Sequence, residues 1–314
     1  ESFGKHSAGS GHVFNLGHGI SQFTPPAAVT VGDAPGRTAG VVLAYHPTDE
    51  IRDNISRLLT QVPRVFVVNN SPDAESRALL AHLDEFRVEI LEQSGNVGVA
   101  AGFNAGMRAA LAAGFDYVWI FDQDSTVADG MLDALLRAQA RTDLKVGIVG
   151  PALRAAETGN IYDADRGQGS APIEALISSG ALFSRPLLED IGLHDEALFI
   201  DYVDHDISLR AGRAGYTNLK VFDTLLDHRF GDSQPAQFFW RRVYLANYSP
   251  MRHYYTSRNR IIVARRFGMG RWFRDDIRFA TKAWVKVLFC ERDRPAKLGA
   301  FCRGLRDGLR YRAV

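Results

Sequence analysis

Short apolar runs alternate with longer amphipathic segments through the first half of this chain. Four runs rich in β-branched and aromatic residues stand at 41–46, 65–70, 88–91 and 117–120, and polar, turn-forming residues end them. One segment of helical length, around 51–59, lies between the first and second runs, and another, at 100–113, lies between the third and fourth. Strands that alternate with helices predict a mostly parallel α/β sheet, whose ligands bind beyond the carboxyl ends of the strands.

Two carboxylates follow the apolar run at 117–120. Asp122 and Asp124 belong to the sequence Asp-Gln-Asp-Ser, and side chains at i and i+2 of an extended strand point to the same face. They can therefore converge on one hard cation that keeps positions open for phosphate oxygens. An ordinary turn or helix cap is the alternative interpretation. Asn69 and Asn70 end another predicted strand, so we expect these polar groups at one edge of the sheet.

A glycine-rich segment at 95–106 leads into the helix-like stretch that starts near residue 100. Glycine lets backbone approach a ligand closely, and a helix N-terminus offers N–H groups and a positive dipole to phosphate. The segment therefore predicts a phosphate or nucleotide contact. Its glycine spacing, and its place in the third strand–helix unit rather than the first, argue against a dinucleotide-binding fingerprint.

These motifs together resemble the family 2 glycosyltransferases of the GT-A fold, in particular a bacterial rhamnosyltransferase-like branch, over about residues 38–265. The resemblance implies a mostly parallel sheet flanked by helices, with a C-terminal helical extension. It implies that the nucleotide base and ribose are held by Ala44, Tyr45, Asn69 and Asn70. It also implies contacts to the nucleotide sugar from Asn96, Gly98, Gly102 and Asn104. Asp-Gln-Asp-Ser is the metal motif typical of the rhamnosyl branch, so Asp122 and Asp124 are expected to bind Mg2+ or Mn2+, with Asp122 also contacting the donor.

Three carboxylates within six residues mark the start of another predicted helix. Asp201, Asp204 and Asp206 could simply favour the helix dipole. Inverting glycosyl transfer, however, needs a general base to take the proton of the acceptor hydroxyl. Alignment from Arg210 onto the family's Glu-Asp-x-Asp-x-x-x-Arg form makes Asp204 the catalytic base and Asp206 the second acidic residue. Val203 departs from the family's glutamate, and Asp201 is a substitute base.

Later segments supply further candidates. Residues 178–185 place small hydroxyl residues and glycine before an apolar strand, which suits either close approach of a sugar or an ordinary turn. His228 follows a strand-like run where the family frequently closes its metal or diphosphate site with histidine; a structural histidine is the alternative. Arg252 and Arg258 lie in a segment resembling Tyr-Tyr-x-x-Arg-Asn. Their guanidinium groups suit diphosphate or acceptor phosphate, or else a solvated helix face.

Composition agrees with a cytoplasmic enzyme. The chain has 314 residues, of which 46% are hydrophobic, and Cys290 and Cys302 show neither metal-ligand spacing nor a disulfide framework. Its apolar runs fall short of the roughly 18 to 20 residues that span a bilayer, and its first residues do not resemble a signal peptide. We predict an N-terminal arm at 1–37, a catalytic domain at 38–250 and a basic, amphipathic helical region at 251–314.

The C-terminal region carries most of the surplus charge. From Arg252 onward, 17 Lys and Arg residues stand against five Asp and Glu, a surplus of 12, although the net charge of the chain is +1. Aromatic residues are interleaved with these charges, which suits an interfacial helix on anionic lipid. A basic face packed on the catalytic domain, or nucleic acid, would also fit. Because family acceptors are commonly lipid-linked glycans, we predict an anionic membrane partner, at the inner face of the cytoplasmic membrane, and no nucleic acid.

The first residues belong to a different pattern. Residues from about 8 to 29 resemble the C-terminal tail of uroporphyrinogen decarboxylase. That enzyme needs a whole barrel, which about 30 residues cannot form. We therefore expect no decarboxylase activity.

The combined prediction is an inverting, metal-dependent glycosyltransferase. It would move L-rhamnose from dTDP-L-rhamnose to a cell-surface polysaccharide or lipid-linked oligosaccharide. The alternatives are a UDP-sugar transferase for galactofuranose or glucose, and a non-catalytic module that binds nucleotide sugars. A nucleotidyltransferase is a further alternative, but it should have a basic, glycine-rich phosphate loop after its first strand, where this chain has Ala-Tyr-His-Pro at 44–47.

Overall fold

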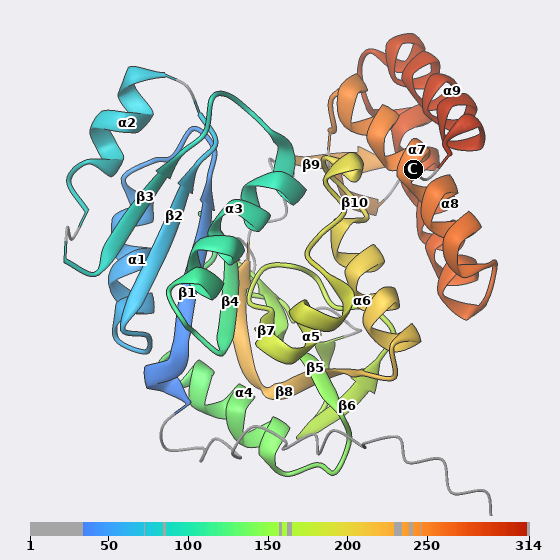
Figure 1. Ribbon diagram of the computed structural model, residues 1–314. Coiled ribbons are helices and arrows are strands. Elements are labelled where there is room, and N and C mark those ends of the chain that lie inside the picture. The colour runs from blue at the N-terminus through green and yellow to red at the C-terminus, as the bar shows by residue number, and fades with distance from the viewer. Residues whose placement is uncertain are drawn as a thin grey trace, which may run out of the picture.

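An eight-stranded sheet forms the centre of the computed structural model, with the strand order β3-β2-β1-β4-β7-β5-β8-β6 (Figure 1). The strands are β1 (Thr38–Ala44), β2 (Arg64–Asn69), β3 (Val88–Glu92), β4 (Tyr117–Asp122), β5 (Val146–Ala155), β6 (Ser170–Ile173), β7 (Leu182–Ser184) and β8 (Thr217–His228). The structure describes residues 34–71, 73–83, 86–156, 159–161, 165–228, 234–238, 241–245 and 247–312. The decarboxylase-like stretch lies outside these residues.

The sheet is mostly parallel, as predicted. β3, β2, β1 and β4 pair in parallel, and so do β5 and β8. β7 runs antiparallel between β4 and β5, and β6 runs antiparallel along β8. The carboxyl ends of β1, β2, β3, β4 and β8 therefore meet at one edge of the sheet, where ligands of such folds bind.

Helices cover both faces of this sheet, which explains why its strands read as continuous apolar runs. The helices are α1 (Glu50–Leu59), α2 (Ala74–Leu80), α3 (Gly98–Ala112), α4 (Met131–Ala140), α5 (Arg185–Ile191), α6 (Val203–Arg213), α7 (Pro250–Phe267), α8 (Arg271–Cys290) and α9 (Arg294–Arg310). Apolar residues of α1 and α4 form one core with Val42 and Trp119, whereas those of α3, α5 and α6 form another with Val41 and Ile120. Each fully buried large side chain contributes about 1.5–3 kcal/mol.

Two glycines let α3 approach the sheet closely. A Cβ on Gly102 would stand 2.4 Å from Cδ1 of Leu43, and one on Gly106 would stand 2.3 Å from Cγ1 of Val41. Both distances are too short for a carbon–carbon contact, so only glycine permits this helix–strand spacing. Part of the glycine-rich pattern therefore serves packing between α3 and β1.

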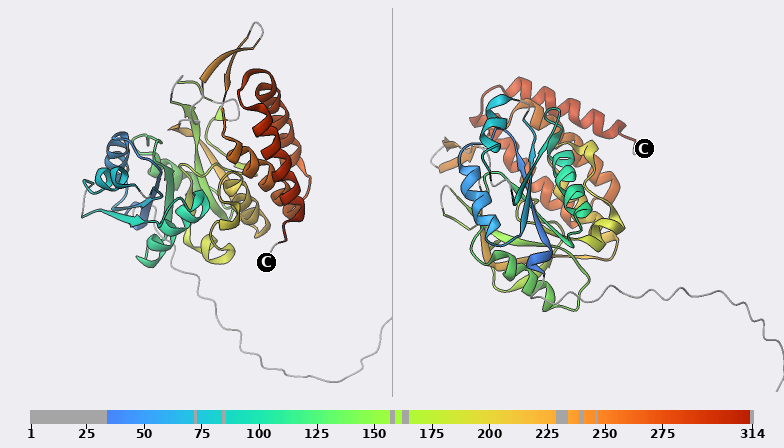
Figure 2. Two further views of the ribbon diagram at one scale, coloured as in Figure 1. Left: turned by 90° about the horizontal axis from the view of Figure 1, so that it is seen from above. Right: turned by 60° about the vertical axis from the view of Figure 1, so that its left-hand side comes forward.

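The last three helices form a group on the side of the molecule opposite β3 and α2, which Figures 1 and 2 show from different directions. β9 (Gln234–Phe238) and β10 (Arg241–Leu245) form an antiparallel pair that precedes this group. α7 and α9 pack closely, since a Cβ on Gly304 would stand 2.0 Å from Oγ of Ser257. Within the described ranges, none of the helices is long and apolar enough to cross a membrane. The predicted domain boundary near residue 250 stays a prediction.

Candidate active site

The predicted metal ligands converge at the carboxyl edge of the sheet. Asp122 is the last residue of β4 and His228 the last of β8, while Asp124 lies in the turn that follows β4. The turn reaches β8 through a bridge in which the N–H of Thr126 donates to the carbonyl of Asp227 at 3.0 Å. One ligand atom from each of Asp122, Asp124 and His228 lies within 4.8 Å of the other two.

The local geometry differs from the extended strand that we expected. The strand ends at Asp122, and the N–H of Ser125 donates to the carbonyl of Asp122 at 3.3 Å, so a turn brings Asp124 back toward Asp122. The expectation of an extended strand through Asp124 was therefore wrong. A turn can direct two nearby carboxylates to one point as well as a strand can.

Two buried serines orient the histidine. Oγ of Ser125 lies 2.9 Å from Nδ1 of His228 and 2.7 Å from Oγ of Ser179, which also accepts the N–H of Asp122 at 3.1 Å. A hydroxyl partner on one ring nitrogen fixes the ring, as outer partners of metal-binding histidines do. We predicted no role for Ser125 and left the segment around Ser179 as either a sugar contact or an ordinary turn. Because Ser125 directly follows Asp124 in the sequence, its place next to the metal motif could have indicated that it supports a metal ligand.

Gln123 joins this turn to the loop after β1. Its Oε1 accepts the N–H of Tyr45 at 2.8 Å, and its Nε2 donates to the carbonyl of Tyr45 at 2.9 Å. Tyr45 remains 46% exposed beside the carboxylates. Gln123 is thus a positioning residue that we did not predict, and the exposed Tyr45 stays a prediction for nucleotide contact. Ala44, in contrast, is fully buried in the core and its carbonyl accepts the N–H of Asn70, so its predicted nucleotide contact conflicts with its position.

The asparagines after β2 shape the neighbouring loops. Nδ2 of Asn69 donates to both carboxylate oxygens of Glu92, at 3.1 and 3.0 Å. Oδ1 of Asn70 accepts the N–H of Val97 at 2.9 Å, and its Nδ2 donates to Oδ1 of Asn96 at 3.2 Å. Asn69 and Asn70 are both buried. Their visible contacts hold the β2 and β3 loops together, and nucleotide contact by Asn69, Asn70 and Asn96 stays a prediction.

The N-terminus of α3 does not offer its N–H groups to a phosphate. The N–H groups of Val99 and Ala100 donate to the carbonyl of Phe199, at 2.6 and 3.2 Å. Gly98 has φ of +87°, and a Cβ there would stand 2.4 Å from the Phe199 ring. The expected phosphate site at this helix end is therefore wrong. Gly98 and Gly102 both make room for protein side chains, and their predicted contact with the nucleotide sugar stays a prediction.

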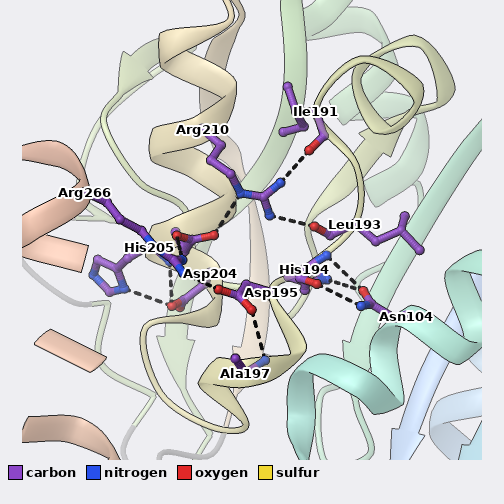
Figure 3. Close-up of polar contacts among 11 residues, drawn as sticks. Asn104, Ile191, Leu193, His194, Asp195, Ala197, Asp204, His205, Arg210 and Arg266 are labelled. Atoms are coloured by element: carbon purple, nitrogen blue, oxygen red, sulfur yellow. Dashed lines mark hydrogen bonds and ion pairs between the residues drawn. The ribbon is translucent and has the colours of Figure 1, made fainter. Parts of the chain in front are cut away.

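The side-chain amide of Asn104 is engaged by contacts within the protein. Its Nδ2 donates to the carbonyl of His194 and its Oδ1 accepts the N–H of His194, each at 2.9 Å (Figure 3). Its Nδ2 also donates to Oε1 of Glu196 at 2.9 Å. Asn104 is buried, so these contacts occupy the amide. The predicted sugar contact of Asn104 conflicts with this arrangement. Instead, Asn104 ties α3 to the segment that precedes α6.

A strained loop delivers the predicted base. Phe199, Asp201 and Tyr202 have φ of 62°, 63° and 64°, a left-handed conformation that costs about 1–3 kcal/mol for each such residue. Nδ2 of Asn259, on α7, lies 2.7–2.9 Å from the carbonyl oxygens of Leu198, Ile200 and Asp201. One buried amide from α7 thus holds the backbone that leads into α6.

Asp204 stands in the first turn of α6 beside His205. Its Oδ1 accepts the backbone N–H of His205 at 2.9 Å and lies 2.8 Å from Nδ1 of that ring. Burial alone would raise the pKa of Asp204, but the charge and hydrogen bonds of His205 outweigh burial and hold this pKa below its usual range. Burial opposes the charged form of His205 too, yet the Asp204 carboxylate raises the pKa of His205. Each member of the pair therefore favours the charged form of the other.

The Asp204 carboxylate acts electrostatically on Asp122, one of the candidate metal ligands. Burial raises the pKa of Asp122, the carboxylates of Asp124 and Asp204 add to this effect, and His228 and Arg252 oppose it. Four charged or titratable groups therefore act on Asp122, and they come from the turn after β4, from α6, from β8 and from α7. Such a concentration of carboxylates calls for a cation.

Asp206 faces away from this group. Its carboxylate is fully buried, with Oδ2 accepting Nε of Arg210 and Oδ1 accepting Nη1 of Arg266, each at 2.8 Å. Arg210 also donates to the carbonyls of Ile191 and Leu193 (Figure 3). Both oxygens of Asp206 are engaged by guanidinium groups. The predicted catalytic role of Asp206 therefore conflicts with the structure, which makes it a structural ion pair.

The two predicted phosphate-binding arginines differ. Arg252 contacts Asp201 at 3.0 Å, lies 3.9 Å from the centre of the Tyr248 ring, and acts electrostatically on Asp122. Arg258 donates to the carbonyl of Ala197 and lies over the ring of Tyr255. Arg252 is thus at the edge of the acidic site, and its phosphate contact stays a prediction. Arg258 holds the loop before α6 through its contact with Ala197, and its predicted contact to phosphate stays a prediction.

The sheet, its acidic edge and the paired helices are those of a GT-A nucleotide-sugar transferase. The sequence profile described as Glycosyl transferase family 2 matches residues 41–199, about half of the chain, so the chain belongs to this family. It is accordingly a glycosyltransferase whose donor is a nucleotide sugar.

Two curated relatives cover most of the chain. The dTDP-rhamnosyl transferase RfbF of Shigella flexneri is 27% identical over 244 residues, which are 72% of this chain and 79% of that protein. The galactofuranosyltransferase GlfT1 of Mycobacterium tuberculosis is 28% identical over 248 residues, 70% of this chain and 79% of that protein. The relatives thus include transferases named for two different sugars.

Solved structures share the fold at low identity. S. aureus TarS, solved in complex with UDP-GlcNAc, has a TM-score of 0.55 at 14% identity, covering 85% of this chain and 81% of that chain. GalNAc-T7, solved with UDP, GalNAc and Mn2+, has a TM-score of 0.54 at 13% identity, covering 73% of this chain and 47% of that one. Both likenesses concern the fold.

The decarboxylase-like stretch has its own match. Uroporphyrinogen decarboxylase of Janthinobacterium sp. (strain Marseille) is 97% identical over 31 residues, which are 10% of this chain and 9% of that enzyme. The resemblance seen in the sequence is thereby confirmed, and it is confined to this short stretch.

Proposed function

We propose that this glycosyltransferase transfers L-rhamnose from dTDP-L-rhamnose, with inversion, to a cell-surface polysaccharide or lipid-linked glycan at the cytoplasmic face of the membrane. The observations that carry the proposal are the convergence of Asp122, Asp124 and His228, and the effect of the Asp204 carboxylate on the pKa of Asp122. They combine a candidate cation site with a candidate base. The choice of rhamnose rests on the Asp-Gln-Asp-Ser motif and on the similarity to RfbF.

The three convergent side chains fit a divalent cation. Two carboxylates and one imidazole suit Mn2+ and, with more water ligands, Mg2+. One ligand atom from each of Asp122, Asp124 and His228 lies within 4.8 Å of the other two, so these three residues would hold the ion. When bound, the ion would stabilise negative charge on the departing nucleotide diphosphate.

Asp204 would act as the general base. Its ionised carboxylate can accept the proton of the acceptor hydroxyl while that oxygen attacks the anomeric carbon of the donor sugar. His205 orients the carboxylate through Oδ1, which leaves Oδ2 as the oxygen to face the acceptor. Arg252 would add positive charge near the diphosphate. Each residue thus has a separate task.

A UDP-galactofuranose transferase is the second candidate, because GlfT1 is 28% identical to this chain over a similar length. A non-catalytic module that binds nucleotide sugars is less well supported, since Asp204 and the candidate metal ligands are all present together.

A thermal-shift screen tests the proposal. Purified protein would be melted with dTDP, UDP or GDP, each with and without Mn2+, because a ligand of the native state raises the melting temperature. We expect a metal-dependent rise with dTDP, followed by transfer from dTDP-L-rhamnose. Preference for UDP would move the donor to the galactofuranose class, and no shift with any nucleotide would overturn the proposed function.

Three asparagine variants separate the roles. Asp124→Asn should abolish the metal-dependent rise in melting temperature. Asp204→Asn should keep that rise and lose transfer, typically by 10²- to 10⁴-fold. The exposed Asp129 lies on the same loop as Asp124, so Asp129→Asn is the matched control and should resemble the wild type. Wild-type turnover by Asp204→Asn would remove it as the base.

A further inference from the structure

The outer face of α8 mixes positive charge with large apolar side chains. Five apolar residues of this helix are exposed to solvent by 39–73%, namely Ile277, Phe279, Val285, Leu288 and Phe289. Four basic residues are exposed among them, namely Arg271, Arg274, Arg278 and Lys282. We call these nine residues the α8 outer face. Single exposed apolar residues are ordinary, but Val285, Leu288 and Phe289 lie together near the end of the helix, and such a cluster indicates an interaction site.

Basic and apolar residues of α8 lie on the same, solvent-exposed side of the helix. At 3.6 residues per turn, Arg271, Arg278, Lys282, Val285 and Phe289 fall on one narrow stripe, and the other members of the α8 outer face flank it. The buried Ala280 and Val287 lie on the opposite side. Charge and aromatic groups therefore share the solvent side, rather than separating into a polar outside and an apolar inside.

The charge of the surroundings is strongly positive. Residues 271–312 contain 12 Lys and Arg against five Asp and Glu, a surplus of seven. Asp275 lies on the outer side and pairs with Arg278 at 3.1 Å and Arg271 at 3.9 Å, so it neutralises part of the stripe. Asp276 points inward. The remaining surplus favours a negatively charged partner.

The inner side of α8 contacts the helix that carries the base. Asp276 accepts the hydroxyl of Tyr202 and Nε of Arg260, each at 2.7 Å. The ring of Trp272 lies 5.6 Å from the ring of His205, the neighbour of Asp204. One helix thus presents its outer face to solvent and its inner face to residues that flank the candidate base.

We propose that the α8 outer face lies on an anionic lipid bilayer, with α8 in the plane of the interface. Basic residues would meet lipid headgroups while Val285 and Phe289, which lie on the stripe, enter the boundary of the acyl chains, with Leu288 on one flank and Phe279 on the other. Because α8 also contacts Tyr202 and His205, a bilayer on this face brings membrane-borne acceptors to the side of the molecule that holds Asp204. This last step rests on the proposed function, whereas bilayer binding does not.

Vesicle flotation tests the surface directly. The full chain would be mixed with vesicles of phosphatidylcholine alone, or of phosphatidylcholine and phosphatidylglycerol in equal parts. We expect flotation with the anionic vesicles only, and its loss at high salt. The triple variant Arg271→Glu, Arg278→Glu, Lys282→Glu should reduce the bound fraction at least about tenfold. Phe279→Ser with Phe289→Ser should also weaken binding, because the apolar contribution to insertion is lost.

A second triple variant controls for net charge. Arg57→Glu, Arg137→Glu, Arg141→Glu makes the same change at exposed positions of α1, α4 and the residue after α4, and it should float like the wild type. Flotation unchanged by the α8 charge reversal would overturn the inference. So would wild-type protein that ignores anionic vesicles or binds RNA in their place, or a wild-type dimer that the α8 reversal converts to monomer.

Activity separates this inference from the proposed function. The α8 variants should keep wild-type hydrolysis of the nucleotide sugar and transfer to a water-soluble acceptor, and they should lose only transfer to an acceptor embedded in vesicles. A wild-type protein that floats with anionic vesicles but uses no donor would overturn the proposed function alone. A protein active on soluble acceptors that never floats would overturn the bilayer surface alone.

Discussion

Phe199 occupies the space next to Gly98 in which a side chain of residue 98 would lie. A Cβ at position 98 would stand 2.4 Å from Cδ2 of the Phe199 ring, and Gly98 has φ of +87°. The carbonyl of Phe199 accepts N–H groups of Val99 and Ala100 at the start of α3. The glycine-rich turn after β3 and the loop before α6 are therefore packed and hydrogen-bonded together. Through this contact the turn can influence the position of Asp204.

Gly98→Ala should damage this unit more than conformational strain alone explains. Gly114 has a nearly identical φ of +88°, but a Cβ there meets nothing within 4 Å. Gly114→Ala should therefore cost only the left-handed strain of about 1–2 kcal/mol in the free energy of unfolding. Gly98→Ala should cost clearly more and should also lower kcat, because Phe199 must move. Equal losses in urea unfolding, with unchanged kcat, would contradict this coupling.

Asn259 should control turnover without contacting a substrate. Asn259→Ala leaves three loop carbonyls without their shared donor, each costing about 1–3 kcal/mol if it remains buried and unpaired. The loop at 199–202 should relax, and kcat should fall at least tenfold while the thermal shift with nucleotide is retained. Asn218→Ala is the matched control. That amide donates to Glu174 and Ser208 carbonyls at 3.0 Å, so its loss should lower stability but keep kcat.

The place of the candidate metal ligands could be predicted because the ends of the strands can be recognised in the sequence. Apolar runs buried on both faces marked β1, β2, β3 and β4, and parallel strands bring their carboxyl ends to one edge. Asp122 and Asp124 follow such an end, and the resemblance to the family added His228. Their convergence therefore needed only the order of the strands.

Other assignments failed because the residue types do not reveal their partners. A glycine needed for a ligand and one needed for a neighbouring ring look alike in sequence, and Gly98 and Gly102 proved to be required by protein side chains. Asp204 and Asp206 differ by half a helical turn, and only packing shows that Arg210 and Arg266 engage Asp206. Contacts between segments some 60 residues apart, such as Asn259 with the 198–201 backbone, leave no local pattern.

His205 should set the acid limb of the pH profile. It holds the pKa of Asp204 down despite burial, so the base stays ionised to lower pH than it otherwise would. His205→Gln keeps the backbone N–H and removes the imidazole that lowers the pKa of Asp204, so this pKa should rise. Transfer is lost when the base protonates. The acid limb of kcat/KM should therefore move to higher pH, whereas the exposed His82→Gln should leave it in place; an unmoved limb in His205→Gln would separate His205 from the base.

His194 should make the fold sensitive to mild acid. Burial lowers its pKa from 6.5 to about 3, with Arg210 acting in the same direction. Its Nε2 has no hydrogen-bond partner among the residues that the structure describes. The neutral ring is thus required in the folded state. A histidine with a depressed pKa stabilises the fold above the pKa of the unfolded chain, and that contribution is lost as pH falls from about 6.5 toward 3.

The loss should be measurable well above the pH of general acid unfolding. Between pH 7 and pH 5 the protonation of His194 in the unfolded chain should remove about 2 kcal/mol from the free energy of unfolding. His194→Phe suits the site, since the rings of Phe103 and Phe183 lie 6.0 and 5.8 Å away. The variant should lose some stability at pH 7, but urea unfolding should show a flatter decline to pH 5 than in the wild type or His82→Gln. Parallel declines would mean that His194 takes up its proton in the folded state and that other groups cause the acid sensitivity.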